Sequence, residues 1–386
     1  MSIEFPMSRP LQALTTALVV STAAVLSAGC ATNSDSPADQ STAFAARRNA
    51  AVQSEINKIV KSGVAGMLAT LTADGHTTTL TSGVANHDTS ESISVNSRFR
   101  IGSITKSFTA AILMQLVSEA RLNLDDTIEK HLPGMLSGEG VDGRTITVRQ
   151  ILQHRSGLPE FAGDPRTDEL KAAAEHRTVT PSEALAVALG YPAQSRPGAE
   201  YKYTNTNYLI AGILIEKITG NSYADELNNR LLRPHSLNDT YLPPPGELGI
   251  RGPHPHGYEK DNGVVVDVSR IEPSVPWAAG AIVSTGADLN RFFLDLLNGK
   301  VVAPAQLAEM EQFIPNGDGG PGYGIGLEAT ALPCGARLIG HSGGIPGYYT
   351  ISGATAQGRA ATITFTQAPD AQPDIAALLT YALCDQ

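Results

Sequence analysis

The sequence predicts a mixed α/β (α+β) protein in which helices flank an antiparallel sheet and an all-helical domain is inserted. Alternation of apolar and polar residues, typical of strands, occurs at 64–84 and returns after about residue 255. The stretch between has helical spacing and many loops. We therefore expect a sheet domain made of about 44–115 plus 255–386, and a helical domain at about 116–254.

Individual elements follow from local patterns. Asp74-Gly75 between two alternating runs indicates a hairpin turn, and apolar residues three or four apart indicate a strong helix at 103–120. We expect strands at 64–71, 77–84, 264–268, 337–341, 348–354 and 360–366, and helices at 44–62, 103–120, 148–153, 181–189, 206–219, 224–232, 289–297, 304–313 and 374–384.

Composition excludes several classes of protein. The chain has 386 residues, a net charge of −10 and a hydrophobic fraction of 42%, which excludes disorder for most of the chain. Its acidic balance argues against a nucleic-acid partner, which would require a basic surface. No cluster of ligand residues has metal spacing: His254-Pro255-His256 has no carboxylate or cysteine placed with it.

Residues 1–30 have the pattern of a signal peptide. After Arg9 an uncharged, Ala- and Leu-rich run ends in small residues before Cys30. The segment 26–30 resembles a bacterial lipobox, so we expect lipid attachment to Cys30, with cleavage near Ala31 or a retained anchor as alternatives. Residues 31–43 suit a polar tether. The expected location is secreted or anchored to the outer face of a bacterial cell membrane.

Only Cys334 and Cys384 remain if Cys30 is processed. An exported chain meets an oxidising compartment, so we expect a disulfide between them, with two buried free thiols as the alternative.

Ser103-Ile104-Thr105-Lys106 places a hydroxyl and an amine three residues apart on one face of the predicted helix. Serine needs an adjacent base to act as a nucleophile, and a buried lysine with a lowered pKa can serve. The nearby helix N-terminus favours developing negative charge. The spacing alone is common in long chains.

Two further segments carry groups suited to chemistry. Tyr203-Thr204-Asn205 precedes an apolar helix, where a capping loop is the alternative interpretation. The second segment is Gly340-His341-Ser342-Gly343-Gly344, in which we expect a strand to end at His341 and a hydroxyl and two glycines to follow. The pattern Gly-x-Ser-x-Gly is also that of an α/β-hydrolase nucleophile, but no histidine follows Ser342, so the required chain order of that triad fails.

Taken together, Ser103-x-x-Lys106, Tyr203-x-Asn205 and His341-x-Gly343 closely resemble the serine β-lactamase and penicillin-binding protein superfamily. The resemblance is to the branch with class C β-lactamases, secreted serine-type D-Ala-D-Ala carboxypeptidases and related esterases. It covers roughly 45–386, including blocks at 99–108, 152–158, 197–208, 234–240, 277–285 and 322–327. It implies a β-lactamase/transpeptidase-like fold for 44–386, and the two cysteines resemble the disulfide of secreted carboxypeptidases.

The resemblance implies a role for each residue. Ser103 would form an acyl-enzyme, Lys106 would assist proton removal, and Tyr203, as a phenolate between cations, would act as base and then acid. Asn205 would bind the substrate amide and His341 would supply polarity or positive charge. The remaining expected substrate contacts are the hydroxyl of Ser342, the N–H of Gly344 (an oxyanion donor with that of Ser103) and Trp277, for which core packing is the alternative.

We therefore predict an exported serine acyl-hydrolase without cofactor or metal, most like a D-Ala-D-Ala carboxypeptidase. A β-lactamase, a broad esterase, or a penicillin or peptidoglycan sensor that turns over slowly are the alternatives. The expected ligands are cell-wall peptides, β-lactams or esters, with membrane attachment through Cys30.

One departure from the related carboxypeptidases concerns the substrate. Those enzymes resemble this chain but carry an arginine just after the Gly-Tyr-Gly-x-Gly-Leu block, where this chain has Glu328 and no arginine up to Pro333. A glutamate facing the site would repel a terminal carboxylate, and Arg337 could compensate only if its strand turned it inward. We expect weak carboxypeptidase activity and better turnover of neutral esters or of amides without a free carboxylate.

Overall fold

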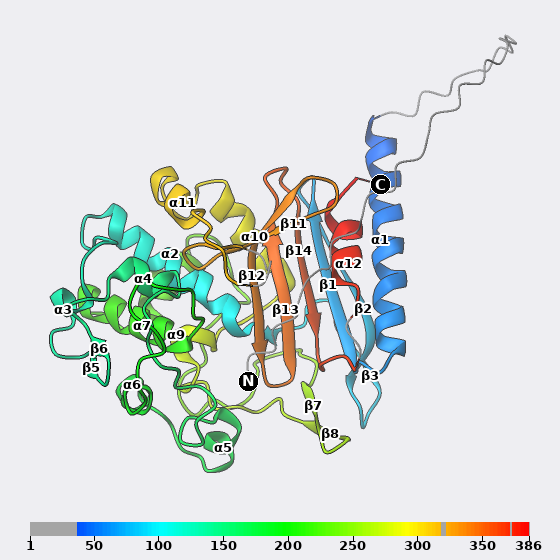
Figure 1. Ribbon diagram of the computed structural model, residues 1–386. Coiled ribbons are helices and arrows are strands. Elements are labelled where there is room, and N and C mark those ends of the chain that lie inside the picture. The colour runs from blue at the N-terminus through cyan, green and yellow to red at the C-terminus, as the bar shows by residue number, and fades with distance from the viewer. Residues whose placement is uncertain (1–36, 318–321, 371–372, 386) are drawn as a thin grey trace, which may run out of the picture.

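The computed structural model describes residues 37–317, 322–370 and 373–385 (Figure 1). The predicted signal peptide, Cys30 and residues 31–36 lie outside the described residues. Residues 37–43, expected in a tether, instead begin α1 (Pro37–Lys61). Proline suits a first helical position because its fixed φ matches the helix and it has no N–H to satisfy there. None of the described helices is both long and apolar enough to cross a membrane.

The predicted mixed α/β fold with an antiparallel sheet is confirmed. Eight strands lie in the order β10-β11-β12-β13-β14-β1-β2-β3, and β1 pairs with β14, so both ends of the chain meet in one sheet. The strands are β1 (Gly66–Ala73), β2 (His76–Asn86), β3 (Glu91–Ser92), β10 (Gly322–Tyr323), β11 (Glu328–Ala331), β12 (Arg337–Ile345), β13 (Tyr348–Ala354) and β14 (Ala360–Phe365).

Strand β12 differs from the prediction in a way that matters for the site. It continues past His341 to Ile345, because Gly343 and Gly344 still pair with Thr350 and Tyr349 of β13. The glycines interrupt the apolar pattern without ending the strand. A Cβ atom at Gly343 would lie 2.0 Å from the carbonyl oxygen of Ile101, so the close approach of another segment requires glycine there.

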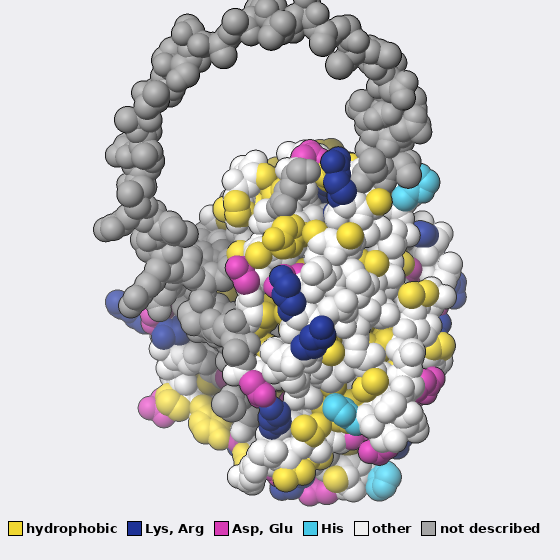
Figure 2. Space-filling model, turned by 90° about the vertical axis from the view of Figure 1, so that its right-hand side faces the viewer, with side chains coloured by type: hydrophobic (Ala, Val, Ile, Leu, Met, Phe, Trp, Pro, Cys, Tyr) yellow, Lys and Arg dark blue, Asp and Glu magenta, His cyan; other side chains and the backbone are white. Residues whose placement is uncertain are grey.

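Helices cover both faces of the sheet (Figure 1). On one face, α1 and α12 (Ile375–Leu383) pack Ile56 and Leu378 against Met67 of β1 in one apolar cluster. On the other, α10 (Gly286–Leu297) contributes Phe292 to the larger core. The face of the molecule that carries α1 shows basic and acidic side chains scattered among uncharged ones (Figure 2).

A helical region lies beside the β12 side of the sheet. Its helices are α3 (Ile128–His131), α4 (Val148–Leu152), α5 (Glu169–Ala174), α6 (Pro181–Leu189), α7 (Asn205–Thr219), α8 (Tyr223–Leu227), η2 (Asn228–Leu232, a π-helical turn), α9 (Trp277–Gly280) and α11 (Pro304–Met310). Short two-stranded pairs join β4 (Phe99–Arg100) to β9 (Val283–Ser284), β5 (Ser137–Gly138) to β6 (Val141–Asp142) and β7 (Tyr258–Asp261) to β8 (Val264–Asp267).

Between the sheet and these helices lies α2 (Thr105–Ser118), preceded by a 3₁₀ turn, η1 (Gly102–Ile104). The predicted helix 103–120 therefore begins with a tighter turn and ends two residues early. Residues 105–114 are all buried, as expected for a helix that packs on every side. Because α2 is enclosed, the residues at its start have fixed positions relative to β12, α7 and α9.

Candidate active site

Ser103 and Lys106 lie at the start of α2 and face each other. The Nζ atom of Lys106 is 2.9 Å from Ser103 Oγ, 2.8 Å from Asn205 Oδ1 and 2.9 Å from the carbonyl oxygen of Ala279. Gly102, with φ of +51°, shapes the turn that presents Ser103. The amine thus joins three segments: α2, α7 and α9.

Lys106 is completely buried. Burial lowers its pKa to about 7, against the opposing charges of Glu160 and Glu328, which favour the ammonium. A substantial fraction of neutral amine is therefore present near pH 7. Such an amine can accept the proton of the Ser103 hydroxyl that it contacts.

Tyr203 lies just before α7, with its ring against both Lys106 and His154. Lys106 Nζ is 4.9 Å from the ring centroid, and the imidazole of His154 stacks on the ring with centroids 4.1 Å apart. Ser103 hydrogen-bonds the Tyr203 hydroxyl, but burial is the larger influence and raises the pKa of Tyr203 well above 10. The expected phenolate is therefore disfavoured: the phenol is neutral in the resting site.

Asn205 reaches the same site from the first turn of α7. Its Oδ1 accepts from Lys106, while its backbone N–H and Nδ2 donate to Glu160 Oε2 at 2.7 and 3.1 Å. Sequence reasoning missed Glu160. It follows the 152–158 block by two residues, and an isolated loop glutamate has no pattern that marks it as a site residue.

The third segment lies on β12, where the edge next to β11 is open. β11 pairs with residues 337–340, so Ser342 and Gly344 have no strand partner on that edge within the described parts of the chain. Glu328 Oε2 accepts the N–H of Ser342 at 3.0 Å, and Glu328 Oε1 lies 3.1 Å from its Oγ. Residues two apart in a strand direct their N–H groups to the same edge, so Gly344 N–H also faces the open edge.

Gly344 lies beside the start of α2. A Cβ atom on Gly102 would come within 2.9 Å of Gly344 N, which places this backbone against the turn carrying Ser103. His341 is buried, and burial lowers its pKa despite the charge of Glu328, so the expected positive charge is disfavoured. Ser342 bonds to a carboxylate rather than to a histidine, an arrangement unlike that of a nucleophile and its base.

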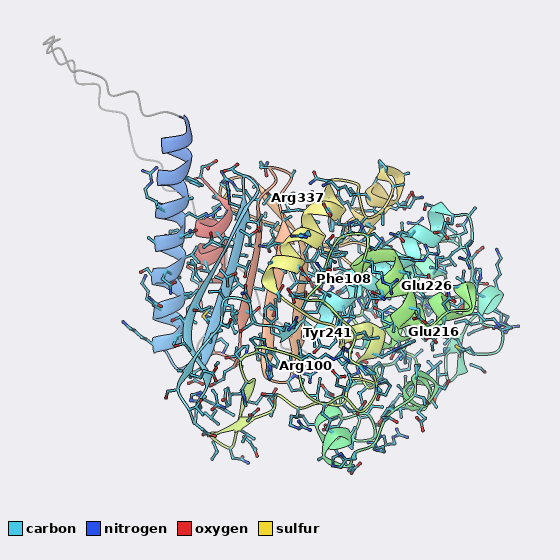
Figure 3. The ribbon with its side chains drawn as sticks, turned by 180° about the vertical axis from the view of Figure 1, so that it is seen from behind. Arg100, Phe108, Glu216, Glu226, Tyr241 and Arg337 are labelled. Atoms are coloured by element: carbon cyan, nitrogen blue, oxygen red, sulfur yellow. A yellow bond between two sulfur atoms is a disulfide. The ribbon has the colours of Figure 1, made fainter. Side chains whose placement is uncertain are left out.

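Trp277, an expected substrate contact, and Arg337, considered as a substitute for the absent arginine, both pack elsewhere. The indole of Trp277 packs on Gly212 of α7 and meets the ring of Tyr223 edge-on at 5.5 Å, so its contacts are those of core packing. Arg337 is exposed, with its guanidinium 5.0 Å from the ring centroid of Phe313. Figure 3 shows Arg337 far from Arg100, which lies three residues before Ser103 in the sequence. Exposed and packed on Phe313, Arg337 does not replace the absent arginine.

The disulfide expected between Cys334 and Cys384 is present, with Cα atoms 6.0 Å apart. It joins the β11–β12 turn to the end of α12. The strands that carry Glu328 and His341 are thereby tied to the far side of the sheet.

Comparisons with known proteins show the family to which the chain belongs. A penicillin-binding protein 4 from Amycolatopsis lactamdurans is 30% identical over 236 residues, 59% of this chain and 58% of that protein. The chain spans 28% to 58% of the length of curated relatives that it matches.

Two solved structures match along nearly their whole length. A D-stereospecific amidohydrolase from Streptomyces sp. is 35% identical, with a TM-score of 0.80 and coverage of 88% of this chain and 99% of that one. A D-amino acid amidase from Ochrobactrum anthropi SV3, complexed with L-phenylalanine amide, is 26% identical, with a TM-score of 0.77 and coverage of 86% and 98%. The family model described as Beta-lactamase matches residues 46–383. The chain therefore belongs to the beta-lactamase family, the serine β-lactamase and penicillin-binding protein superfamily, and has the fold of its acyl-hydrolases.

Proposed function

We propose that this protein is a serine amidohydrolase that cleaves amides of D-amino acids or short D-peptides without a free carboxylate beside the scissile bond. The observation that carries the proposal is Glu328, whose carboxylate is bound to the N–H and hydroxyl of Ser342 at the open edge of β12. The likeness to a D-stereospecific amidohydrolase and a D-amino acid amidase supports the reaction and the stereochemistry.

Acylation follows from the contacts of Ser103. Its Oγ bonds to the amide carbon while the neutral amine of Lys106 takes its proton. The N–H groups of Ser103 and Gly344 receive the oxyanion. The C–N bond then breaks as Tyr203 gives its hydroxyl proton to the leaving nitrogen, and the Lys106 ammonium returns a proton to the Tyr203 phenolate.

Deacylation uses the same groups with water as the nucleophile. Water bonds to the acyl carbon and loses a proton to Lys106, and the C–O bond to Ser103 breaks as Ser103 regains a proton. In this proposal Asn205, which Lys106 and Glu160 hold by hydrogen bonds, binds the substrate amide.

The negative charge of two carboxylates near the site supports a substrate that carries an amine. Glu160 and Glu328 both act electrostatically on Lys106, which places two carboxylates around the site. A pair of carboxylates favours a protonated α-amine in the ligand and disfavours a carboxylate. Glu328 also acts electrostatically on Tyr203, the proposed proton donor to the leaving group.

A substrate panel tests the proposal. We expect D-phenylalanine amide to be hydrolysed faster than its L-enantiomer, with ammonia release as the measurement. We also expect a D-Ala-D-Ala peptide amide to be hydrolysed faster than the free acid, with loss of the intact peptide followed by chromatography. Ser103→Ala is the inactive control. Preference for the free acid would assign a carboxypeptidase, and hydrolysis of nitrocefin alone would assign a β-lactamase.

We also propose that the protein acts outside the cytoplasm, secreted or held on the outer face of the cell membrane by a lipid on Cys30. The N-terminal pattern and the disulfide support this. Mass spectrometry of the mature N-terminus and fractionation of Cys30→Ala cells test it: loss of membrane association is expected, and an intact residue 1 would contradict it.

A further inference from the structure

A chain of hydrogen bonds behind Tyr203 joins the loop before α7 to β12. The backbone N–H of Thr204 lies 3.2 Å from His154 Nδ1, and His154 Nε2 lies 3.2 Å from Tyr323 Oη. Tyr323 Oη lies 3.0 Å from His341 Nε2. All three side chains are buried, so their polar atoms depend on these protein partners.

The direction of this chain is set at its first link, because a backbone N–H can only donate. Nδ1 of His154 therefore accepts, and the proton of its neutral ring is on Nε2, which donates to Tyr323 Oη. The hydroxyl proton of Tyr323 then goes to Nε2 of His341. His341 must carry its own proton on Nδ1, where it donates to the carbonyl oxygen of Ser342.

A protonated His341 does not fit this chain. Its Nε2–H would direct a second donor at Tyr323 Oη, in addition to that of His154. Among the groups that face His341, Glu328 favours the cation, with Oε1 3.8 Å from Nδ1, whereas Lys106 disfavours it. Burial is the largest influence: it lowers the pKa of His341 and of His154 and raises that of Tyr323, so all three favour their neutral forms.

We propose that His154 and Tyr323 are positioning residues that hold His341 neutral with its proton on Nδ1, so that His341 gives the site a hydrogen-bond donor and no positive charge. The proposal rests on the proposed amidohydrolase function. His341 holds the carbonyl of Ser342 while Glu328 holds its N–H, and together they orient the backbone that leads to Gly344. A substrate carboxylate at this edge then meets Glu328 without a cation on His341 to offset it.

Nitrogen NMR of the full chain labelled with ¹⁵N-histidine tests the assignment directly. We expect His154 as the Nε2–H form and His341 as the Nδ1–H form, with neither becoming imidazolium between pH 6 and 8. Loss of signals in His341→Asn assigns the resonances. An imidazolium at position 341 near neutral pH, or the opposite tautomer, overturns the proposal.

Tyr323→Phe removes the hydroxyl at the centre of the chain of hydrogen bonds. We expect His341 to populate both tautomers and kcat for an amide to fall several-fold, with KM little changed, because the effect acts through orientation. Tyr348→Phe is the matched control, since Tyr348 is a buried tyrosine whose hydroxyl donates to the carbonyl oxygen of Pro255, outside the hydrogen-bond chain. A single unchanged tautomer in Tyr323→Phe contradicts the proposed role.

Two substitutions of His341 separate charge from hydrogen bonding. His341→Asn retains a donor near the Nδ1 position and carries no charge, so the ratio of kcat/KM for free acid over amide should stay within about twofold of wild type. His341→Lys adds a cation and should raise that ratio about tenfold. A tenfold fall in His341→Asn would show that wild-type His341 is charged. If the histidines showed the expected tautomers but the protein had no amidase activity, only the proposed function would be rejected.

Discussion

Lys106 Nζ lies 2.9 Å from Ser103 Oγ, and the lysine side chain is completely enclosed by protein. An exposed lysine would be ammonium at neutral pH and could not accept a proton. Burial changes this, because transfer out of water disfavours the charged form. The enclosure of the start of α2 by β12, α7 and α9 therefore sets the basicity of the amine as well as its position.

The pH dependence of acylation follows from this burial. Only the neutral amine of Lys106 accepts the Ser103 proton, and its pKa is about 7. We expect kcat/KM to fall about tenfold per pH unit below 7 and to level off above it. Stopped-flow measurement of acylation between pH 5 and 9 checks this. A rate that is flat down to pH 5 would exclude Lys106 as the base.

Ser103→Ala should abolish covalent labelling by a fluorescent penicillin and all turnover. Ser342→Ala is the matched control, because Ser342 also lies in the site region but bonds to Glu328 rather than to an amine. We expect it to retain labelling. Labelling of Ser103→Ala but not of Ser342→Ala would reverse the assignment of the nucleophile.

Tyr203→Phe should lower kcat for an amide about a hundredfold or more, the scale of lost acid–base assistance. A p-nitrophenyl ester needs no protonation of its leaving group, so its acylation should fall much less. The pair of substrates tests the role of Tyr203 as an acid. Equal losses for both would indicate that Tyr203 acts mainly by positioning Ser103, to which it is hydrogen-bonded.

Sequence patterns predicted the contacts between residues that are close in sequence. Ser103 and Lys106 are three residues apart on a helical turn, so their proximity follows from the period of the helix. Asn205 lies 99 residues from Lys106 in sequence, so only the family resemblance predicted that the two residues share a site. The continuation of β12 past His341 depends on pairing with β13, which no pattern within β12 reveals.

Other site features arise only in three dimensions. Glu160 binds Asn205 across 45 residues, and Tyr323 bridges two histidines from different segments. The phenolate expected for Tyr203, and the positive charge that was one of two options for His341, are disfavoured because burial, not neighbouring charge, is the largest influence on the pKa of both. Burial depends on the packing of elements distant in sequence.

Reduction of the disulfide should destabilise the protein. Cys334 and Cys384 are separated by 50 residues, and on chain-entropy grounds a loop of this length stabilises the fold by about 4 kcal/mol. We expect urea denaturation of the double variant Cys334→Ala/Cys384→Ala to show a loss of this order, and mass spectrometry of the unreduced protein to find the two peptides linked. Alkylation of both thiols without reductant would contradict the bond.

Glu328 should determine the selectivity between free acids and amides. Glu328→Gln can still accept the N–H of Ser342 through its amide oxygen, so the local backbone is retained while the charge is lost. A partly screened like-charge repulsion is worth ~1.4 kcal/mol, about tenfold in rate.

We therefore expect kcat/KM for a D-Ala-D-Ala free acid to rise about tenfold relative to its amide in Glu328→Gln. It should rise further in Glu328→Arg, which adds the bidentate cation that carboxylates favour. Glu160→Gln is the control for a general loss of negative charge: it should lower the rate for amides with a free amine without improving the free acid. If both glutamine variants changed the free-acid ratio equally, the net charge of the site, and not the placement of Glu328 beside Ser342, would govern selectivity.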